Sequence, residues 1–421
     1  MVTSATTPAS ATATGEALGQ SIDDARALCL ATVPADSRVR STLLGSMAKA
    51  RAFADRPDAW VDVGQAWMRQ LRSTSDSGYA LHADACARVA LEIAPDQRRA
   101  LGLLAQVRLD AHDFARAREI AQAVLSREPD DASALGTSSD AALELGDVAA
   151  ATDAAQKLIE LAPGLGAYAR ASYLRWLSGD EPGALEMARL AIDSAGDPDE
   201  LDARAWILVQ TAHLFWHRGD VEGAEAGYRM ALQVRPEYAP ALLGLGKAAI
   251  ATERDRDAAE HLGRALAAHA DVETAALASE VSQRLNDAAG AARSEAMIED
   301  LGRHDRRALA LWLANRRADP ARAIELARGE LRVRGDIYTE DALGWALYAG
   351  GQLGEAEEHA ERAVRLGTRD ALLLYHLGAI RIGLGKVAAG KALLEQALRQ
   401  NPRFDRAGAA DARRLLGRVG S

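Results

Sequence analysis

One segment near the end of the chain has the spacing of a phosphate-binding loop. Gly385–Ala392 reads GKVAAGKA and fits the pattern G-x4-G-K, in which backbone N–H groups and a lysine hold phosphate oxygens. That loop also needs a Ser or Thr after the lysine as a magnesium ligand, whereas Ala392 has no side-chain oxygen. The preceding residues, LYHLGAIRIGLG, have helical rather than strand spacing. We therefore interpret the segment as a turn followed by a helix.

A second glycine cluster, Gly350–Gly354 (GGQLG), raises the same question. It lies in the stretch LGWALYAGGQLGEAEEHAERAVRLG, in which helical spacing is found on both sides of the glycines. A phosphate loop normally follows a strand, and the chain has no strand-like segment. The cluster is therefore predicted to be a turn between two helices.

His213 and His217 have the spacing of two zinc ligands. They stand at i and i+4 in HLFWH, which puts both imidazoles on one helix face. A zinc protease would need a glutamate directly after the first histidine, where the chain has Leu214, and no third ligand is evident. We interpret the pair as a polar helix face. Because the chain also has neither a G-x-S-x-G elbow nor a recognisable catalytic cysteine, we predict a non-enzymatic protein without metal or cofactor.

Composition favours packed helices and disfavours nucleic acid as a partner. The 421 residues are 48% hydrophobic but only 5% aromatic, whereas strands are enriched in aromatic and β-branched side chains. The formal net charge is −10, and a phosphate backbone calls for a basic surface.

The cysteines and the N-terminal segment predict a cytoplasmic protein. Cys29 and Cys86 form no C-x-x-C and are too few for a disulfide framework, so we expect a reducing compartment. The first 20 residues, MVTSATTPASATATGEALGQ, lack the features of a secretory signal and predict a disordered tail. No apolar run reaches the roughly 20 residues that span a bilayer, so we expect no membrane insertion.

A repeat organises most of the chain. Pro95, Pro129 and Pro163 lie 34 residues apart. Each unit reads as a first helix, a turn that often contains glycine, and a second helix that ends before the proline. In the second helix, small or apolar residues keep one spacing: Ala117, Ala121, Val124; Ala151, Ala155, Leu158; Ala224, Tyr228, Ala231; and Ala356, Ala360, Ala363.

A two-helix unit of this length resembles the tetratricopeptide repeat (TPR) family. The family places a Leu-Gly pair and an aromatic residue on the first helix, and a small residue where the second helix crosses it. Here Leu245-Gly246, Leu343-Gly344 and Leu377-Gly378 match the pair, and Trp67, Trp176 and Phe215 match the aromatic position. The resemblance implies an all-α, right-handed superhelical solenoid of about ten TPR-like helical hairpins. Glycine would end the first helix, and a following aspartate would cap the second.

The repeat also predicts how the chain is divided. We expect a disordered tail over residues 1–20, N-terminal capping helices over 21–56, the solenoid over 57–402 and a C-terminal capping helix over 403–421. The units at 273–304 and 305–336 keep the repeat length but are degenerate.

The resemblance implies a concave channel, lined by the first helices, in which TPR proteins usually bind extended peptides or helices. The family's carboxylate clamp for chaperone tails is absent, because its Lys and Asn positions are mostly occupied by other residues: Gly102/Gln106, Gly136/Asp140, Val209/His213 and Leu243/Lys247. The family geometry puts eight residues on or near the inner face: Arg99, Gln106, Arg170, Trp206, His213, Trp216, His217 and Lys247.

Aromatic residues are concentrated in the central repeats. Tyr173, Trp176 and Phe215 have core-facing spacing, whereas Trp206 and Trp216 are candidates for exposed binding residues. We therefore expect that replacing both Trp216 and His213 with alanine abolishes partner capture without unfolding the protein.

The predicted function is that of a non-catalytic scaffold or adaptor that binds a peptide or helix of a protein partner. One alternative is a peptide-sensing regulatory protein. Such proteins usually carry a DNA-binding helix-turn-helix, and Ile22–Arg56 has no clear basic recognition helix, which counts against this alternative. Another is a non-catalytic subunit of a larger enzyme or assembly complex. Self-association by end-to-end stacking also stays open.

Overall fold

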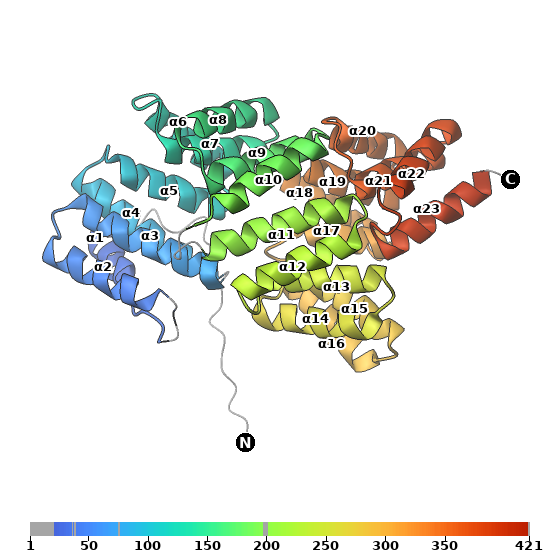
Figure 1. Cartoon of the computed structure of the whole chain (residues 1–421), viewed down its shortest axis with the longest axis horizontal. Coiled ribbons are helices and arrows are strands. Elements are labelled where there is room, and N and C mark those ends of the chain that lie inside the picture. Colours follow the sequence, from blue (N-terminus) through green and yellow to red (C-terminus); the bar gives the residue numbers. More distant parts are fainter. Residues whose placement is uncertain (1–20, 36, 38, 75, 197–200, 420–421) are drawn as a thin grey trace, which may run out of the picture. The chain divides into compact units, whose positions relative to one another are not determined.

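The fold is entirely helical in the part of the chain that the structure describes. A computed structural model describes residues 21–419 apart from 36, 38, 75 and 197–200, and the expected disordered tail over 1–20 lies outside this part. The described residues form helices α1 to α23 and no β-strand, which confirms the all-α prediction (Figure 1).

The chain forms two compact units, which we call unit 1 (Met1–Ala141) and unit 2 (Ala142–Ser421). The boundary falls inside a helix, α7, where the sequence predicts one continuous array. The described helices of unit 1 are α1 (Ile22–Cys29), α2 (Arg40–Ala52), α3 (Pro57–Thr74), α4 (Tyr79–Ile93), α5 (Arg98–Asp110), α6 (Phe114–Leu125) and most of α7 (Ala132–Glu144).

Unit 2 contains the remaining helices. They are α8 (Val148–Leu161), α9 (Leu165–Leu177), α10 (Glu181–Asp193), α11 (Leu201–His217), α12 (Val221–Val234), α13 (Ala239–Ala251), α14 (Asp255–Ala268), α15 (Val272–Arg284), α16 (Ala288–Leu301), α17 (Arg306–Arg316), α18 (Pro320–Leu331), α19 (Ile337–Ala349), α20 (Leu353–Val364), α21 (Ala371–Gly383), α22 (Val387–Gln400) and α23 (Arg406–Val419).

Consecutive helices pack as hairpins: α3 with α4, α5 with α6, and each pair from α9–α10 to α21–α22. Small residues allow the close crossings. A Cβ placed on Gly344 would lie 3.1 Å from backbone atoms of Ala356 and Ala360, and both alanines are buried. The Leu-Gly position on the first helix is therefore the point at which the second helix approaches. This pairing confirms the TPR-like solenoid.

The glycine clusters are turns, as predicted. Gly351 and Gly385 have φ angles of 76° and 75°, in the left-handed region that glycine adopts without strain. Lys386 is the N-cap of α22, and its ammonium pairs with Glu357. The aspartates expected to cap second helices do so; for example, Asp220 accepts a hydrogen bond from the backbone N–H of Gly223 at 2.9 Å.

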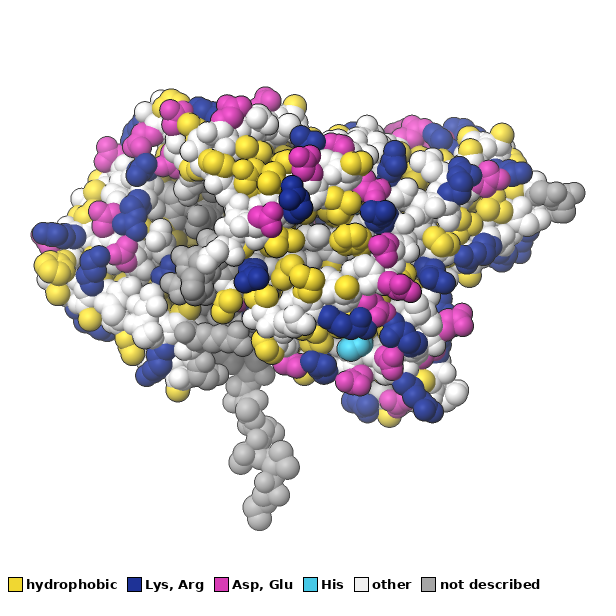
Figure 2. All heavy atoms as spheres, viewed as in Figure 1, with side chains coloured by type: hydrophobic (Ala, Val, Ile, Leu, Met, Phe, Trp, Pro, Cys, Tyr) yellow, Lys and Arg dark blue, Asp and Glu magenta, His cyan; other side chains and the backbone are white. Residues whose placement is uncertain are grey.

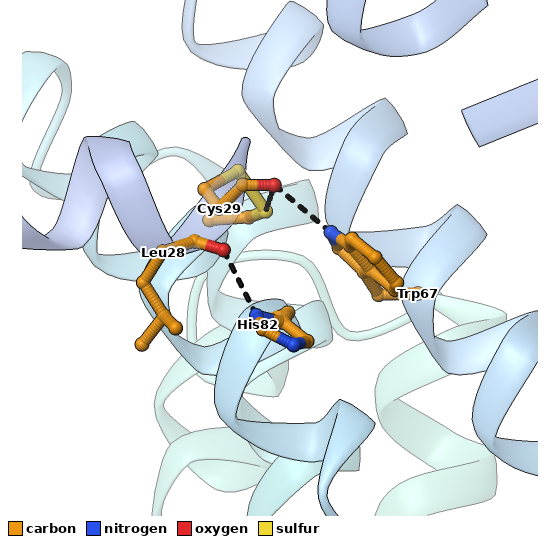
Figure 3. The surroundings of a disulfide bond; sticks show 5 residues. Leu28, Cys29, Trp67 and His82 are labelled. Carbon is orange, nitrogen blue, oxygen red and sulfur yellow. Dashed lines mark hydrogen bonds between the residues drawn. A yellow bond between two sulfur atoms is a disulfide. The ribbon is translucent and has the colours of Figure 1, made fainter. Parts of the chain in front are cut away.

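Unit 1 contains a disulfide bond between Cys29 at the end of α1 and Cys86 in α4. The cysteines are 57 residues apart in sequence and both are fully buried. Beside the bond, the Trp67 indole N–H donates to the Cys29 carbonyl at 2.9 Å, and His82 Nδ1 lies 2.9 Å from the Leu28 carbonyl (Figure 3). The expectation that the two cysteines form no disulfide is therefore wrong, and the compartment stays a prediction.

Unit 2 closes on itself along a line that we call the seam. At the seam, the turns at Gly146, Gly179 and Gly219 lie against the loops at Gly335, Gly367 and Asn401. The Gly335 N–H donates to the Glu144 carbonyl at 2.8 Å, and Asn401 Nδ2 donates to the Trp216 carbonyl at 2.8 Å. Figure 1 shows α9 and α10 (green) next to α19 and α20 (orange) as a result. Residues about half the chain apart in sequence are thus in direct contact in the folded unit.

Candidate binding site inside unit 2

The first helices of unit 2 bring aromatic and charged side chains together on the inner side of the solenoid. Trp176 of α9 stacks on His217 of α11, with ring centroids 4.5 Å apart. The Trp176 indole N–H lies 3.5 Å from the hydroxyl oxygen of Tyr338 of α19. His217 Nδ1 lies 3.6 Å from a carboxylate oxygen of Asp370, the N-cap of α21. The first helices of four hairpins, α9, α11, α19 and α21, therefore contribute to one inner surface, and Trp176 is its buried member.

An ion pair between Lys247 and Glu273 lies on this surface, with Nζ and Oε1 2.7 Å apart. Burial lowers the pKa of Lys247, but the charge and hydrogen bond of Glu273 outweigh it and raise the pKa. The charge of Lys247 lowers the pKa of Glu273 in return. The two side chains keep 34% and 52% of their surface exposed. We conclude that the ion pair is accessible to water and is surrounded by protein but lies outside the packed core.

The histidines beside this ion pair are neutral at physiological pH. Burial, reinforced by the charge of Lys247, lowers the pKa of His213 to about 3. Burial also lowers the pKa of His217, although the nearby Asp370 carboxylate acts in the opposite direction. His213 packs edge-on against the buried Tyr228 ring, with centroids 5.7 Å apart. Both rings therefore offer neutral hydrogen-bonding and stacking surfaces.

A pocket with a free volume of about 70 Å³ lies at the seam. Its wall combines three arginines, a carboxylate and two phenols: Arg307, Arg334, Arg365, Asp336, Tyr173 and Tyr338. Glu144 also lines it and pairs with Arg334.

The structure brings together three of the eight predicted inner-face residues, His213, His217 and Lys247. Arg99 and Gln106 belong to α5 of unit 1, where Arg99 pairs with Asp58 and Asp62 at 2.8 Å each. Arg170 in α9 donates to the Gly166 carbonyl of its own helix at 2.8 Å. Trp206 is 41% exposed on α11. A role in binding stays a prediction for Arg99, Gln106, Arg170 and Trp206.

The prediction that Trp216 is an exposed binding residue is wrong. Its side chain is only 7% exposed and packs in a core with Val221, Tyr228 and Tyr238. Within helix α11, Trp216 is offset to one side of the direction shared by His213 and His217, and its ring packs into this core. The expected double substitution of Trp216 and His213 would therefore damage the core rather than test binding alone.

The core-facing assignment holds for Trp176, which is 2% exposed, but not for Tyr173, which is 37% exposed and lines the pocket. Three further polar residues of unit 2 are not among those predicted from the sequence: Glu273, Arg307 and Tyr338. Each is the second residue of its helix, α15, α17 and α19. A signal was available in the sequence, because polar residues recur at the second position of three consecutive first helices. The degenerate repeats at 273–336 obscured it.

Neither a metal centre nor a membrane span is found among the described residues. Over the described ranges, no three or more His, Cys, Asp and Glu side chains gather where they could hold a metal ion. Within the same residues, no helix has both the length and the apolar character that a membrane crossing requires.

No known family model matches the chain, and no curated protein does. Solved structures with similar folds include PilW, a type IV pilus biogenesis factor (16% identity, 49% of this chain and 93% of that chain, TM-score 0.41). Others are TTC0263, a TPR protein of Thermus thermophilus (18%, 44% and 99%, 0.39), and human IFIT1 (12%, 90% and 94%, 0.48). The chain is a helical-repeat protein with a TPR-like fold, as its own hairpins show.

Proposed function

We propose that the chain is a non-catalytic scaffold or adaptor that holds a segment of a protein partner against the inner surface of unit 2. The observation that supports this most directly is the water-accessible cluster of His213, His217, Lys247 and Glu273 on neighbouring first helices. Such a surface offers fixed charges of both signs next to neutral rings, which suits a polypeptide with mixed side chains.

The seam favours an extended partner segment over a globular surface. It joins turns from the first half of unit 2 to loops from the second half, so the inner surface is bounded by protein on that side. An extended chain can follow the row of first helices and place successive side chains against them.

The charge pattern favours a protein over a nucleic acid. On the face of the molecule in Figure 2, Lys and Arg are interspersed with Asp and Glu over α13–α16 rather than gathered in one basic patch. A phosphate backbone would require such a patch.

A charge-swap experiment tests the inner surface. The double variant Lys247→Glu, Glu273→Lys reverses the polarity of the ion pair but keeps the pair itself, so we expect folding to persist and partner binding to be lost. The matched control swaps the exposed pair Arg264 and Glu237, which lies on α14 and in the loop before α13, with Nη2 and Oε1 2.6 Å apart. Partner captured by the wild type and control but not by the inner swap would support the proposal. Equal capture by all three would overturn it.

The disulfide also concerns the cellular compartment in which the protein would bind a partner. Disulfides persist mainly in oxidising compartments, whereas the sequence favours the cytoplasm. Acid quenching of intact cells, followed by alkylation of the denatured protein, separates the two without requiring access to the buried sulfurs. Modification of both Cys29 and Cys86 would support a cytoplasmic protein, and protection of both would support an oxidising compartment.

A further inference from the structure

We infer that the pocket at the seam binds a small oxyanion, a carboxylate or phosphate group, held chiefly by Arg365 and the hydroxyls of Tyr173 and Tyr338. This inference does not depend on the inner ion pair of the proposed function. The pocket's free volume of about 70 Å³ exceeds the roughly 10–15 Å³ that a single water needs. It is therefore large enough for one small polar group and too small for a large side chain.

Arg365 supplies unused donors. Within the described part of the chain, its guanidinium donates only to backbone carbonyls, those of Arg362 at 3.0 Å and Gly146 at 3.4 Å. A guanidinium has five N–H groups in a planar fork that matches the oxygens of a carboxylate or phosphate. Two of them are used here, so the fork can still bind an oxyanion.

The carboxylate side chains that line the pocket already have hydrogen-bond or ion-pair partners. Asp336 caps α19 by accepting from the backbone N–H groups of Tyr338 at 2.8 Å and Thr339 at 3.2 Å, and it lies 3.4 Å from Arg307. Glu144 pairs with Arg334. Because each carboxylate is already bound to an arginine, the pocket presents an excess of donors and favours an anion over a cation.

The two phenols add neutral donors. Desolvation by the surrounding protein raises the pKa of Tyr173 and of Tyr338, so both hydroxyls stay protonated. The Tyr338 oxygen accepts from the Trp176 indole at 3.5 Å, which leaves its own proton available for a ligand. The pocket thus combines the unused N–H groups of the Arg365 guanidinium with two hydroxyl donors.

Titration calorimetry at constant ionic strength, with chloride as the balancing anion, tests the site. The probes are inorganic phosphate and acetate for a free anion, and N-acetyl-glutamate amide and N-acetyl-phosphoserine amide for a group on a polypeptide. We expect saturable binding of at least one probe. Tighter binding of the two capped amino acids would assign the oxyanion to a partner's side chain, and equal or weaker binding would assign it to a free anion.

Variants locate the site. We expect Arg365→Gln to weaken binding at least tenfold, and Tyr173→Phe to weaken it measurably without changing the melting temperature. Arg369→Gln is the matched control, because Arg369 is exposed on the same loop but does not line the pocket. The inference fails if no probe binds saturably, if Arg365→Gln binds like the wild type, or if Arg369→Gln is weakened equally.

Discussion

Units 1 and 2 hold their repeats together by different means. In unit 1, a disulfide ties the eight-residue helix α1 to α4, and α1 is too short to be stable without such support. In unit 2, the seam joins distant turns through backbone contacts and hydrogen bonds. A covalent link thus secures a short terminal helix, whereas closure of the larger unit depends on close backbone approach at glycine.

The largest expected effect tests the core beside the seam. Trp216→Ala should destabilise unit 2 by about 3–5 kcal/mol, because it removes a buried ring from the core. Trp206→Ala, ten residues earlier on α11 and 41% exposed, should change stability by no more than about 0.5 kcal/mol. Chemical denaturation of both variants measures the difference. Similar costs would mean that the two tryptophans do not differ in burial.

The covalent link of unit 1 should have the next largest effect. Replacing Cys29 and Cys86 with serine should cost about 2–4 kcal/mol, because it removes a constraint on the unfolded chain. Hydrogen exchange should show the loss of protection in α1 and α4 and leave unit 2 unchanged. A reducing agent should lower the stability of the wild type but not that of this variant. Equal loss of protection in α19 and α20 would show that the units are not stabilised separately.

The seam itself can be tested with two glycines of the same backbone conformation. Gly179 and Gly385 have φ angles of 77° and 75°, so alanine at either costs about 1–2 kcal/mol in left-handed strain. Only at Gly179 would the Cβ also meet protein, 2.3 Å from the Gly367 carbonyl oxygen. Gly179→Ala should therefore lower the free energy of unfolding by about 1–3 kcal/mol more than Gly385→Ala does, which is the penalty typical of overpacking. An equal cost at both sites would argue against close contact at the seam.

The smallest effect, counted per pH unit, is the loss of stability in acid. Because the pKa of His213 is about 3 in the folded protein and 6.5 without perturbation, the unfolded state binds the proton more readily. The stability that depends on neutral His213 is complete above pH 6.5 and is lost as the pH falls below it, at up to about 1.4 kcal/mol per pH unit. His213→Gln should flatten this slope between roughly pH 6.5 and 4.5. An unchanged slope in His213→Gln would contradict the assignment.

Much of the local structure could be predicted from neighbouring residues. The turns at Gly351 and Gly385, the cap at Asp220 and the crossing at Gly344 each depend on a few residues within one repeat. For this reason the glycine clusters could be recognised as turns from their flanking residues alone. The proximity of His213 and Lys247 could be expected from the same repeat geometry, and their role in binding stays a prediction.

The sequence by itself determined the helices, their caps, the hairpins and the small residues at their crossings, because these follow from contacts within about 34 residues. Only the tertiary structure decided that Cys29 meets Cys86, that Trp216 is buried, that Tyr173 faces a pocket and that Gly179 lies against Gly367. The contact of Gly179 with Gly367 and the pocket at Tyr173 depend on how small rotations between repeats add up along the solenoid. No single repeat encodes that sum, so residues far apart in sequence are brought together only in the folded protein.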